Sequence, residues 1–160
     1  LEGNLLKVNP IDKLFNKPIS GSTRDMRSYQ DMYLEAWKNE LDGLIEMLIE
    51  KGHEDLHEDL LALQVSIKEY SQARANVLVA VFYSSAFDKD FKDDNSIHYG
   101  TICTSERSYI IGNLYRELTL SLIKSLSMEE YELKFDQSNL SREEMELIKQ
   151  LQDYANDNKN

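Results

Sequence analysis

Apolar residues recur every three or four positions along most of the chain, which is the period of an α-helix. The first stripe follows Ser22-Thr-Arg-Asp25, whose S-x-x-D spacing is typical of a capped helix start. It closes at Lys51 and Gly52, a combination typical of a helix C-terminus. The pattern therefore predicts one long helix with an inward face made of Met26, Tyr29, Tyr33, Trp37, Leu41, Leu44 and Leu48.

Two further stripes predict two more long helices. The second helix starts within residues 52–59 and runs to about Tyr83, with an inward face of Leu56, Leu60, Leu63, Ile67, Tyr70, Ala73 (or Arg74), Val77 and Val81. The third occupies about 101–126, with an inward face of Ile102, Tyr109, Ile110, Leu114, Leu118, Leu122 and Leu126. A glycine inside a helix costs roughly 1 kcal/mol relative to alanine. We therefore expect Gly112 to mark a close contact between helices.

The remaining segments are short or irregular. Residues 1–21 read as an irregular lead-in with about one helical turn, and 88–96 as a charged, solvated loop. After Met128, EEYELKFDQ alternates like a short strand or an extended strap. Ser141-Arg-Glu-Glu144 is a capping box that opens a short helix to about Tyr154. The predicted fold is all-α: an antiparallel bundle of three long helices over 22–127, with 128–160 forming a strap and a short C-terminal helix on the same domain.

Composition and charge limit the kinds of partner that the chain is expected to bind. The formal net charge is -11, so a nucleic-acid backbone would be repelled, whereas a basic protein would be attracted. The longest apolar run, 77–83, is far shorter than the roughly 18–20 residues of a membrane span. The lone Cys103 cannot form an internal disulfide. Because the chain starts at Leu1 rather than Met, we expect a signal peptide or lipid anchor to have been removed.

One motif suggests metal chemistry. Residues 53–57 spell H-E-x-x-H, which can place His53 and His57 over a zinc ion with Glu54 as general base. Gly52 and the acidic residues that surround the histidines favour a charged, exposed helix start instead, where carboxylates interact well with the helix dipole. No nucleophile elbow or Gly-rich phosphate loop is present in the sequence. We therefore expect neither a cofactor nor catalysis, with a metal-dependent hydrolase as the alternative.

Tyrosines and two arginines lie on or beside the apolar stripes. The tyrosines either line a groove or belong to the core, with their hydroxyls near its edge; they are Tyr29, Tyr33, Tyr70, Tyr109 and Tyr115. Arg74 and Arg116 belong to two helices that should pack together. Each either extends past apolar neighbours to reach water, pairs with an acid, or helps to form a binding surface.

Residues 22–122 carry a family resemblance. The segment LLALQVSIKEYSQARA resembles the N-terminal family of LprI-type lysozyme inhibitors, whose Gln, Trp and Tyr correspond to Gln64, Ile67 and Tyr70. Two other segments, EAWKNELDGLIEML and YGTICTSERSYIIGNLYREL, are similar to its first and third helices, through Trp37, Glu40 and Leu41 and through Gly100, Thr101, Asn113 and Arg116. Paired cysteines of the family correspond here to Ala75 and Ser108.

The resemblance implies a helical, secreted or cell-envelope domain and, from the member that names the family, lysozyme inhibition. We accordingly expect a non-catalytic binding module that takes a basic protein such as lysozyme. Its expected contact residues are Asp88, Asp90, Asp93, Asp94, Arg74, Arg116 and Tyr70. An oligomerising structural module, joined through the tyrosine-bearing faces, is a further alternative.

Overall fold

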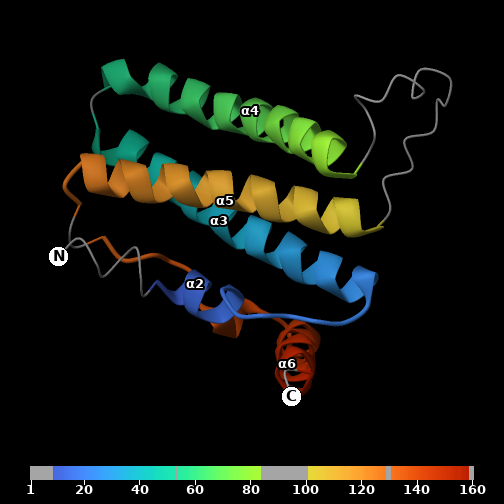
Figure 1. Ribbon diagram of the computed structural model, residues 1–160. Coiled ribbons are helices and arrows are strands. Elements are labelled where there is room, and N and C mark those ends of the chain that lie inside the picture. The colour runs from blue at the N-terminus through green and yellow to red at the C-terminus, as the bar shows by residue number, and fades with distance from the viewer. Residues whose placement is uncertain (1–8, 53, 84–100, 129–130, 159–160) are drawn as a thin grey trace, which may run out of the picture.

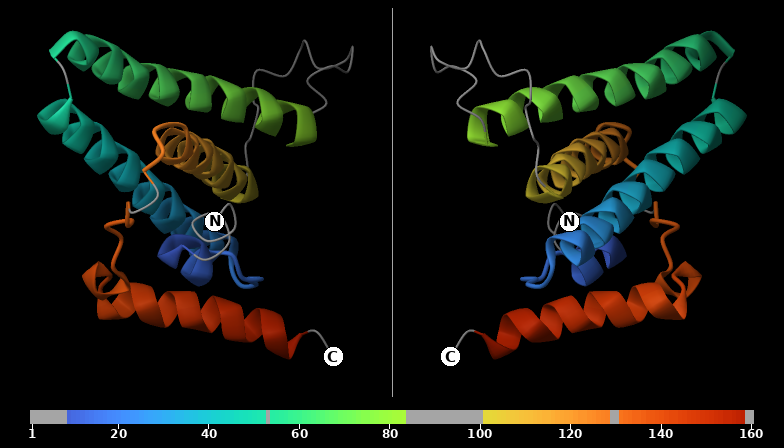
Figure 2. Two further views of the ribbon diagram at one scale, coloured as in Figure 1. Left: turned by 90° about the vertical axis from the view of Figure 1, so that its left-hand side faces the viewer. Right: turned by 90° about the vertical axis from the view of Figure 1, so that its right-hand side faces the viewer.

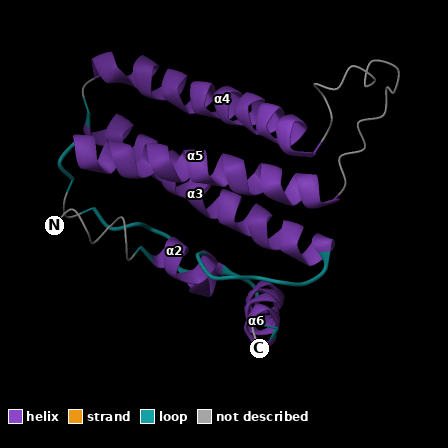
Figure 3. Cartoon of the chain, in the orientation of Figure 1, coloured by secondary structure: helices purple, strands orange, loops and turns teal. Residues whose placement is uncertain are grey.

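The computed structural model of the chain describes residues 9–52, 54–83, 101–128 and 131–158. Within these ranges the fold is all-α, as predicted, and Figure 3 shows no strand there. The helices are α2 (Pro10–Phe15), α3 (Thr23–Lys51), α4 (His57–Tyr83), α5 (Thr101–Ser125) and α6 (Arg142–Asp157), with 3₁₀ turns η1 (Glu54–Leu56) and η3 (Gln137–Asn139). The 131–136 segment is an extended strap rather than a strand.

The long helices are arranged around α5. In Figure 1, α3 and α5 run side by side in the same direction, and α4 returns in the opposite one. Figure 2 shows α3 and α4 meeting near the turn that joins them and then diverging, with α5 between them. Helix α6 crosses below this group, since it is seen end-on in Figure 1 and lengthwise in Figure 2. Among the described helices, α5 is therefore covered on two sides and α4 on one.

Helix α3 matches its predicted boundaries. The Ser22 hydroxyl accepts a hydrogen bond from the N–H of Asp25 at 3.1 Å, and the N–H of Gly52 donates to the carbonyl of Leu48 at 2.7 Å. Five residues of the predicted inward face are buried, namely Tyr29, Tyr33, Trp37, Leu41 and Leu44, and Met26 and Leu48 are half-buried. Satisfied helix ends and a continuous apolar stripe explain why this element follows from the sequence.

The predicted inward face of the second helix is wrong at its first position, Leu56, and beyond Ile67. Tyr70 and Val77 are 54% and 61% exposed, Leu56 is 50% exposed, and Ala73 and Arg74 are also exposed. Ile67 is buried as predicted, and the other buried positions are Ser71, Ala75 and Val79. Ser71 and Ala75 are small, so they allow α4 to approach α5 closely. A prediction based on large apolar residues alone therefore does not show which small residues of the helix face inward.

The predicted inward face of α5 is wrong in part. Leu114 is buried as expected, but Tyr109 and Leu126 are 44% and 49% exposed. Because α5 lies between α3 and α4, its buried surface spans a wide arc. It combines the apolar residues Ile111, Leu114, Tyr115, Leu120 and Ile123 with the small polar residues Ser105, Ser108 and Thr119. The Ser108 hydroxyl donates to Asp31 Oδ1 of α3 at 2.5 Å, and the Thr119 hydroxyl donates to the Tyr115 carbonyl of its own helix at 2.7 Å.

Gly112 marks a close helix contact, as predicted. A Cβ at this position would lie 2.8 Å from Tyr33 Cδ1 and 3.2 Å from Leu34 Cα. Both neighbours belong to α3, so the missing side chain sets the distance between α3 and α5.

The two terminal segments complete the core. Ile11 and Phe15 of α2 are buried, and the Phe15 ring lies 5.2 Å from that of Tyr29. The predicted capping box at Ser141 and Glu144 is present at the start of α6, whose Leu151 is 2% exposed. The Leu151 carbonyl accepts a hydrogen bond from the N–H of Ser20 at 3.0 Å. These contacts place the N-terminal segment and α6 against the same interior as the long helices.

Candidate functional site

Arg116 of α5 forms an ion pair with Asp12 of α2. Its Nη2 donates to Asp12 Oδ2 at 2.6 Å and its Nε to both Asp12 oxygens, and its guanidinium lies 5.8 Å from the Trp37 ring centroid. The hydrogen bonds that the guanidinium donates to the Asp12 carboxylate raise the pKa of Arg116. Of the roles expected for Arg116, this geometry is that of pairing with an acid. The ion pair holds α2 against α5.

Arg74 and Tyr70 form a separate, exposed pair. Arg74 Nη1 donates to the Tyr70 hydroxyl at 3.2 Å, one turn away on α4. The structure thus gives Arg74 and Arg116 different partners on different helices. The other residues expected to contact a partner, Asp88, Asp90, Asp93 and Asp94, lie outside the described residues.

The H-E-x-x-H segment lies where α4 begins. Glu54 and Asp55 belong to η1, His57 is the first residue of α4, and the carboxylates of this segment are exposed. His53 lies outside the described residues. Among the residues the structure describes, no three His, Cys, Asp or Glu side chains are grouped so that they could hold a metal ion. None of the described helices combines the length and apolar character needed to cross a membrane.

Four large apolar side chains of α4 are exposed and are candidates for contact with a partner: Leu61 (51%), Val65 (57%), Tyr70 (54%) and Val77 (61%). Helical spacing places Leu61 with Val65 on one flank of α4 and Tyr70 with Val77 on another. We call these four side chains the outer α4 surface. Acidic residues accompany them, with Glu54, Asp55, Glu58, Asp59 and Glu69 all exposed. Leu61 and Val65 were recognisable in the sequence as apolar residues off the predicted stripe. Tyr70 was among the contact residues expected from the sequence, although it also fell on the predicted stripe, and Val77 was missed because it fell on that stripe.

A groove runs between α3 and the strap that leads to α6, with a volume of about 280 Å³. Glu40 of α3 lines it and is only 3% exposed. Glu40 Oε1 accepts a hydrogen bond from the N–H of Phe135. Oε2 is buried and has no hydrogen-bond partner among the described residues, and neither does the nearby buried hydroxyl of Tyr131.

Electrostatics in the groove follow from this burial. Burial raises the pKa of Glu40, and the backbone N–H groups of Lys134 and Phe135 and the charge of Lys134 oppose that shift. Burial, and then the neighbouring charge of Glu40, raise the pKa of the Tyr131 hydroxyl. The groove therefore holds a carboxylate whose ionised form is poorly solvated.

Sequence reasoning did not single out Glu40 as a functional residue. Glu40 follows Trp37 by three positions and precedes Leu44 by four, so it lies on the apolar stripe of α3. A carboxylate on the apolar stripe could have drawn attention to this position, because charged residues are rarely fully buried without a partner.

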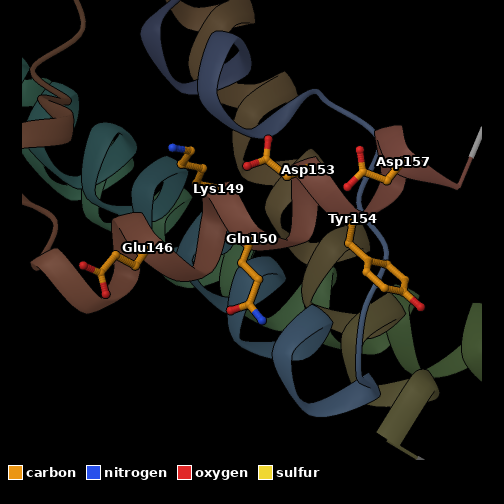
Figure 4. Close-up of a pocket in the computed structure, with 6 residues that line it drawn as sticks. All are labelled: Glu146, Lys149, Gln150, Asp153, Tyr154 and Asp157. Carbon is orange, nitrogen blue, oxygen red and sulfur yellow. The ribbon is translucent and has the colours of Figure 1, made fainter.

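The hollow along α6 is an open surface. About 450 Å³ of space lies over Glu146, Lys149, Gln150, Asp153, Tyr154 and Asp157, which all belong to this one helix. Figure 4 shows their side chains spreading to two sides of the α6 ribbon, without converging on a common point. Without a second wall, this surface cannot enclose a ligand.

Comparison of the chain with known proteins identified no relative. No protein-family model, no curated protein and no solved structure matches the chain.

Proposed function

We propose that the chain is a non-catalytic binding module that recognises a basic protein through the outer α4 surface. The observation that carries the proposal is the exposure of Leu61, Val65, Tyr70 and Val77 along a single helix. Large apolar side chains gathered on one element of a folded domain are typical of protein–protein contact surfaces.

Charge favours a basic partner. The chain carries a formal net charge of -11, and exposed acids at the start of α4 border the apolar residues. Such a surface suits a partner whose apolar patch is edged by lysine and arginine, and it speeds encounter at low salt. Because the sequence resembles LprI-type lysozyme inhibitors, lysozyme is the first partner to test, and we propose a secreted or cell-envelope location on the same basis.

The proposal also needs a rigid support for α4. We propose that α3, α4 and α5 form an antiparallel three-helix bundle, with α6 as a short crossing helix. The opposite direction of α4 relative to α3 and α5 in Figure 1, and the burial of Ala75 and Val79 on its inner side, support this arrangement.

The test combines binding and inhibition. Lysozyme is titrated with the whole chain at low and high salt, while its turnover is measured. A variant in which Leu61, Val65, Tyr70 and Val77 are all replaced by serine should bind at least about tenfold more weakly, a loss of about 1.4 kcal/mol. The matched control is Leu126→Ser, which removes a similarly exposed side chain just after the end of α5 and should leave affinity within about twofold.

Two results would overturn the proposal. One is undiminished binding by the fourfold serine variant. The other is a concentration-dependent dimer that those substitutions dissociate, because the outer α4 surface would then serve a second copy of the chain.

A further inference from the structure

A buried carboxyl group connects the strap at 131–136 to α3. Glu40 of α3 is 3% exposed, and its Oε1 accepts the backbone N–H of Phe135. The other oxygen, Oε2, is shielded from water and has no hydrogen-bond partner among the described residues. A buried acceptor without a donor is costly, and the cost is larger when the acceptor carries a charge. The contact between the strap and α3 is therefore less favourable when Glu40 is ionised than when it is protonated.

A second buried polar group in the same contact lacks a partner. The Tyr131 hydroxyl, at the start of the strap, is shielded from water and makes no hydrogen bond within the described part of the chain. It lies near enough to Glu40 for the charge of that carboxylate to contribute to its raised pKa, after burial. If the strap lifts from α3, water can bond to both groups at once. The hydration gained on opening offsets part of the apolar contact that opening breaks.

Apolar contacts keep the strap closed. The side chains of Leu133 and Phe135 are half-buried and pack against the core, and the Phe135 ring lies 6.3 Å from the Phe15 ring. Half-buried side chains contribute less to stability than fully buried ones, because part of their apolar surface already contacts water. The strap is therefore held by modest apolar contacts and one hydrogen bond to a carboxyl group, which is a balance that a single ionisation can change.

The strap can open without moving the helices at its two ends. The chain leaves α5 through Ser127, and η3 follows the strap before α6 begins. Helix α6 has its own attachments to the core, because the Leu151 carbonyl accepts the Ser20 N–H and Gln152 donates to the Leu14 carbonyl at 2.7 Å. Local opening of such a segment needs less free energy than unfolding of the whole domain.

We propose that Glu40 and the strap form a pH-sensitive latch, which is closed while Glu40 is protonated and opens more often once Glu40 has lost its proton. Opening separates Phe135 from Glu40 and uncovers the half-buried side chains of Leu133, Phe135 and Met32. The latch therefore exposes apolar surface as the solution becomes less acidic. It is separate from the outer α4 surface, because it is formed by α3 and the strap.

The groups around Glu40 set the direction of the pH dependence. Burial raises the pKa of Glu40 by more than two backbone N–H groups of the strap and the charge of Lys134 lower it. Glu35 on α3, Asp136 on the strap and Glu144 on α6 line the adjoining groove, and their negative charges also disfavour an ionised Glu40. The closed strap is therefore most favoured below pH 4.5, the ordinary pKa, and loses this advantage as the pH rises to the raised pKa.

Hydrogen exchange of the Phe135 amide in the whole chain tests the latch, because this N–H is bonded to Glu40 only while the strap is closed. Its protection, corrected for the intrinsic exchange rate, should fall at least about threefold from pH 4.5 to roughly pH 8. The fall should follow the titration of the Glu40 carboxyl carbon measured by NMR. Low urea should leave this exchange unchanged and accelerate that of the Leu41 amide inside α3, because local opening exposes little surface.

Three variants separate the contributions to the latch. Glu40→Gln keeps an acceptor for the Phe135 N–H but has no proton to lose, so protection should vary less than about twofold with pH, whatever its absolute level. Tyr131→Phe removes the second unpartnered group, so protection should rise at least about twofold while its decline with pH remains. Glu46→Gln removes an exposed charge from the same helix and should leave both the level and the decline unchanged.

Four results would overturn the proposal. They are pH-independent protection of the Phe135 amide in the unaltered chain, an undiminished decline in Glu40→Gln, lower protection in Tyr131→Phe, and equal protection of the Phe135 and Leu41 amides. In the last case the strap would open only when the whole domain unfolds.

Discussion

The carboxyl group of Glu40 is buried out of reach of water. The N–H of Phe135 satisfies one carboxylate oxygen and leaves the other without a hydrogen bond among the described residues. Burial therefore raises the pKa of Glu40 above its ordinary value of 4.5, despite opposing backbone N–H groups and the charge of Lys134. At the scale of single residues, this group links protonation to stability.

The raised pKa of Glu40 predicts how the free energy of unfolding changes with pH. Between pH 4.5 and the raised pKa of Glu40, the native state binds more protons than the unfolded state, so the free energy of unfolding should fall as pH rises through this window. Glu40→Gln should lack this decline, while Glu46→Gln should keep it. Urea unfolding at a series of pH values measures both slopes. Parallel curves for the unaltered chain and Glu40→Gln would contradict the prediction.

Ser127 offers a second residue-scale prediction. It has a φ of 51°, in the left-handed region, where the chain leaves α5. Its N–H donates to the Lys124 carbonyl and that of Met128 to the Ile123 carbonyl, which is the Schellman pattern that favours glycine. Ser127→Gly should stabilise the protein by about 1 kcal/mol, whereas Ser127→Ala should not. Thermal unfolding of both variants tests this, and equal stability of the two would argue against strain at this residue.

At the scale of elements, the contact between α3 and α5 depends on a missing side chain. Tyr33 and Leu34 of α3 approach Gly112 so closely that a methyl group has no room. Tyr33 is itself fixed, since its hydroxyl donates to Asn113 Oδ1 at 2.7 Å and its ring stacks on Tyr109 at 5.9 Å. The helix pair cannot open locally without breaking these contacts.

Two glycine-to-alanine substitutions separate helix propensity from packing. Gly43→Ala should stabilise by up to about 1 kcal/mol, because its added Cβ meets only Lys134 atoms at 3.8 Å. Gly112→Ala gains the same propensity but should be destabilising by about 1–2 kcal/mol overall, because Tyr33 or the backbone must move. Chemical denaturation of the two variants measures the contrast. Stabilisation by both would mean that α3 and α5 adjust freely.

Helix α4 shows how an element can have the right boundaries and the wrong inward face. Its start and end follow from the sequence, but packing selects Ser71 and Ala75 over Tyr70 and Val77 as the inner positions. The period of the apolar residues does not report how closely two helices approach. Tyr70 and Val77 belong to the outer α4 surface because of this choice, and the sequence stripe alone placed them on the inward face.

At the scale of the whole molecule, segments far apart in sequence share one core. Ile11 and Phe15 from α2, Trp37 from α3 and Leu151 from α6 belong to the same cluster of buried side chains. Gln152 Nε2 also donates to the Leu14 carbonyl at 2.7 Å, across most of the chain length. We therefore expect the described segments to unfold as one cooperative unit.

Leu151→Ala tests this cooperativity. The side chain is 2% exposed, so truncation should cost about 2–4 kcal/mol. The loss should appear equally in the fluorescence of Trp37, the single tryptophan, and in the helical circular dichroism. Leu126→Ala, at an exposed site, should cost less than about 0.5 kcal/mol. If Leu151→Ala shifts circular dichroism but leaves the Trp37 transition unchanged, α6 unfolds separately.

The sequence by itself determined the elements of this protein. Helical period, the caps at Ser22 and Ser141, the close contact at Gly112 and the strong acidity are local or additive properties, and each was readable without coordinates. Tertiary structure alone decided which residues face inward on α4 and α5, the pairing of Arg116 with Asp12, and the enclosure of Glu40 by the strap. The physical reason is that burial and pairing depend on the distance between surfaces remote in sequence, which no local pattern specifies.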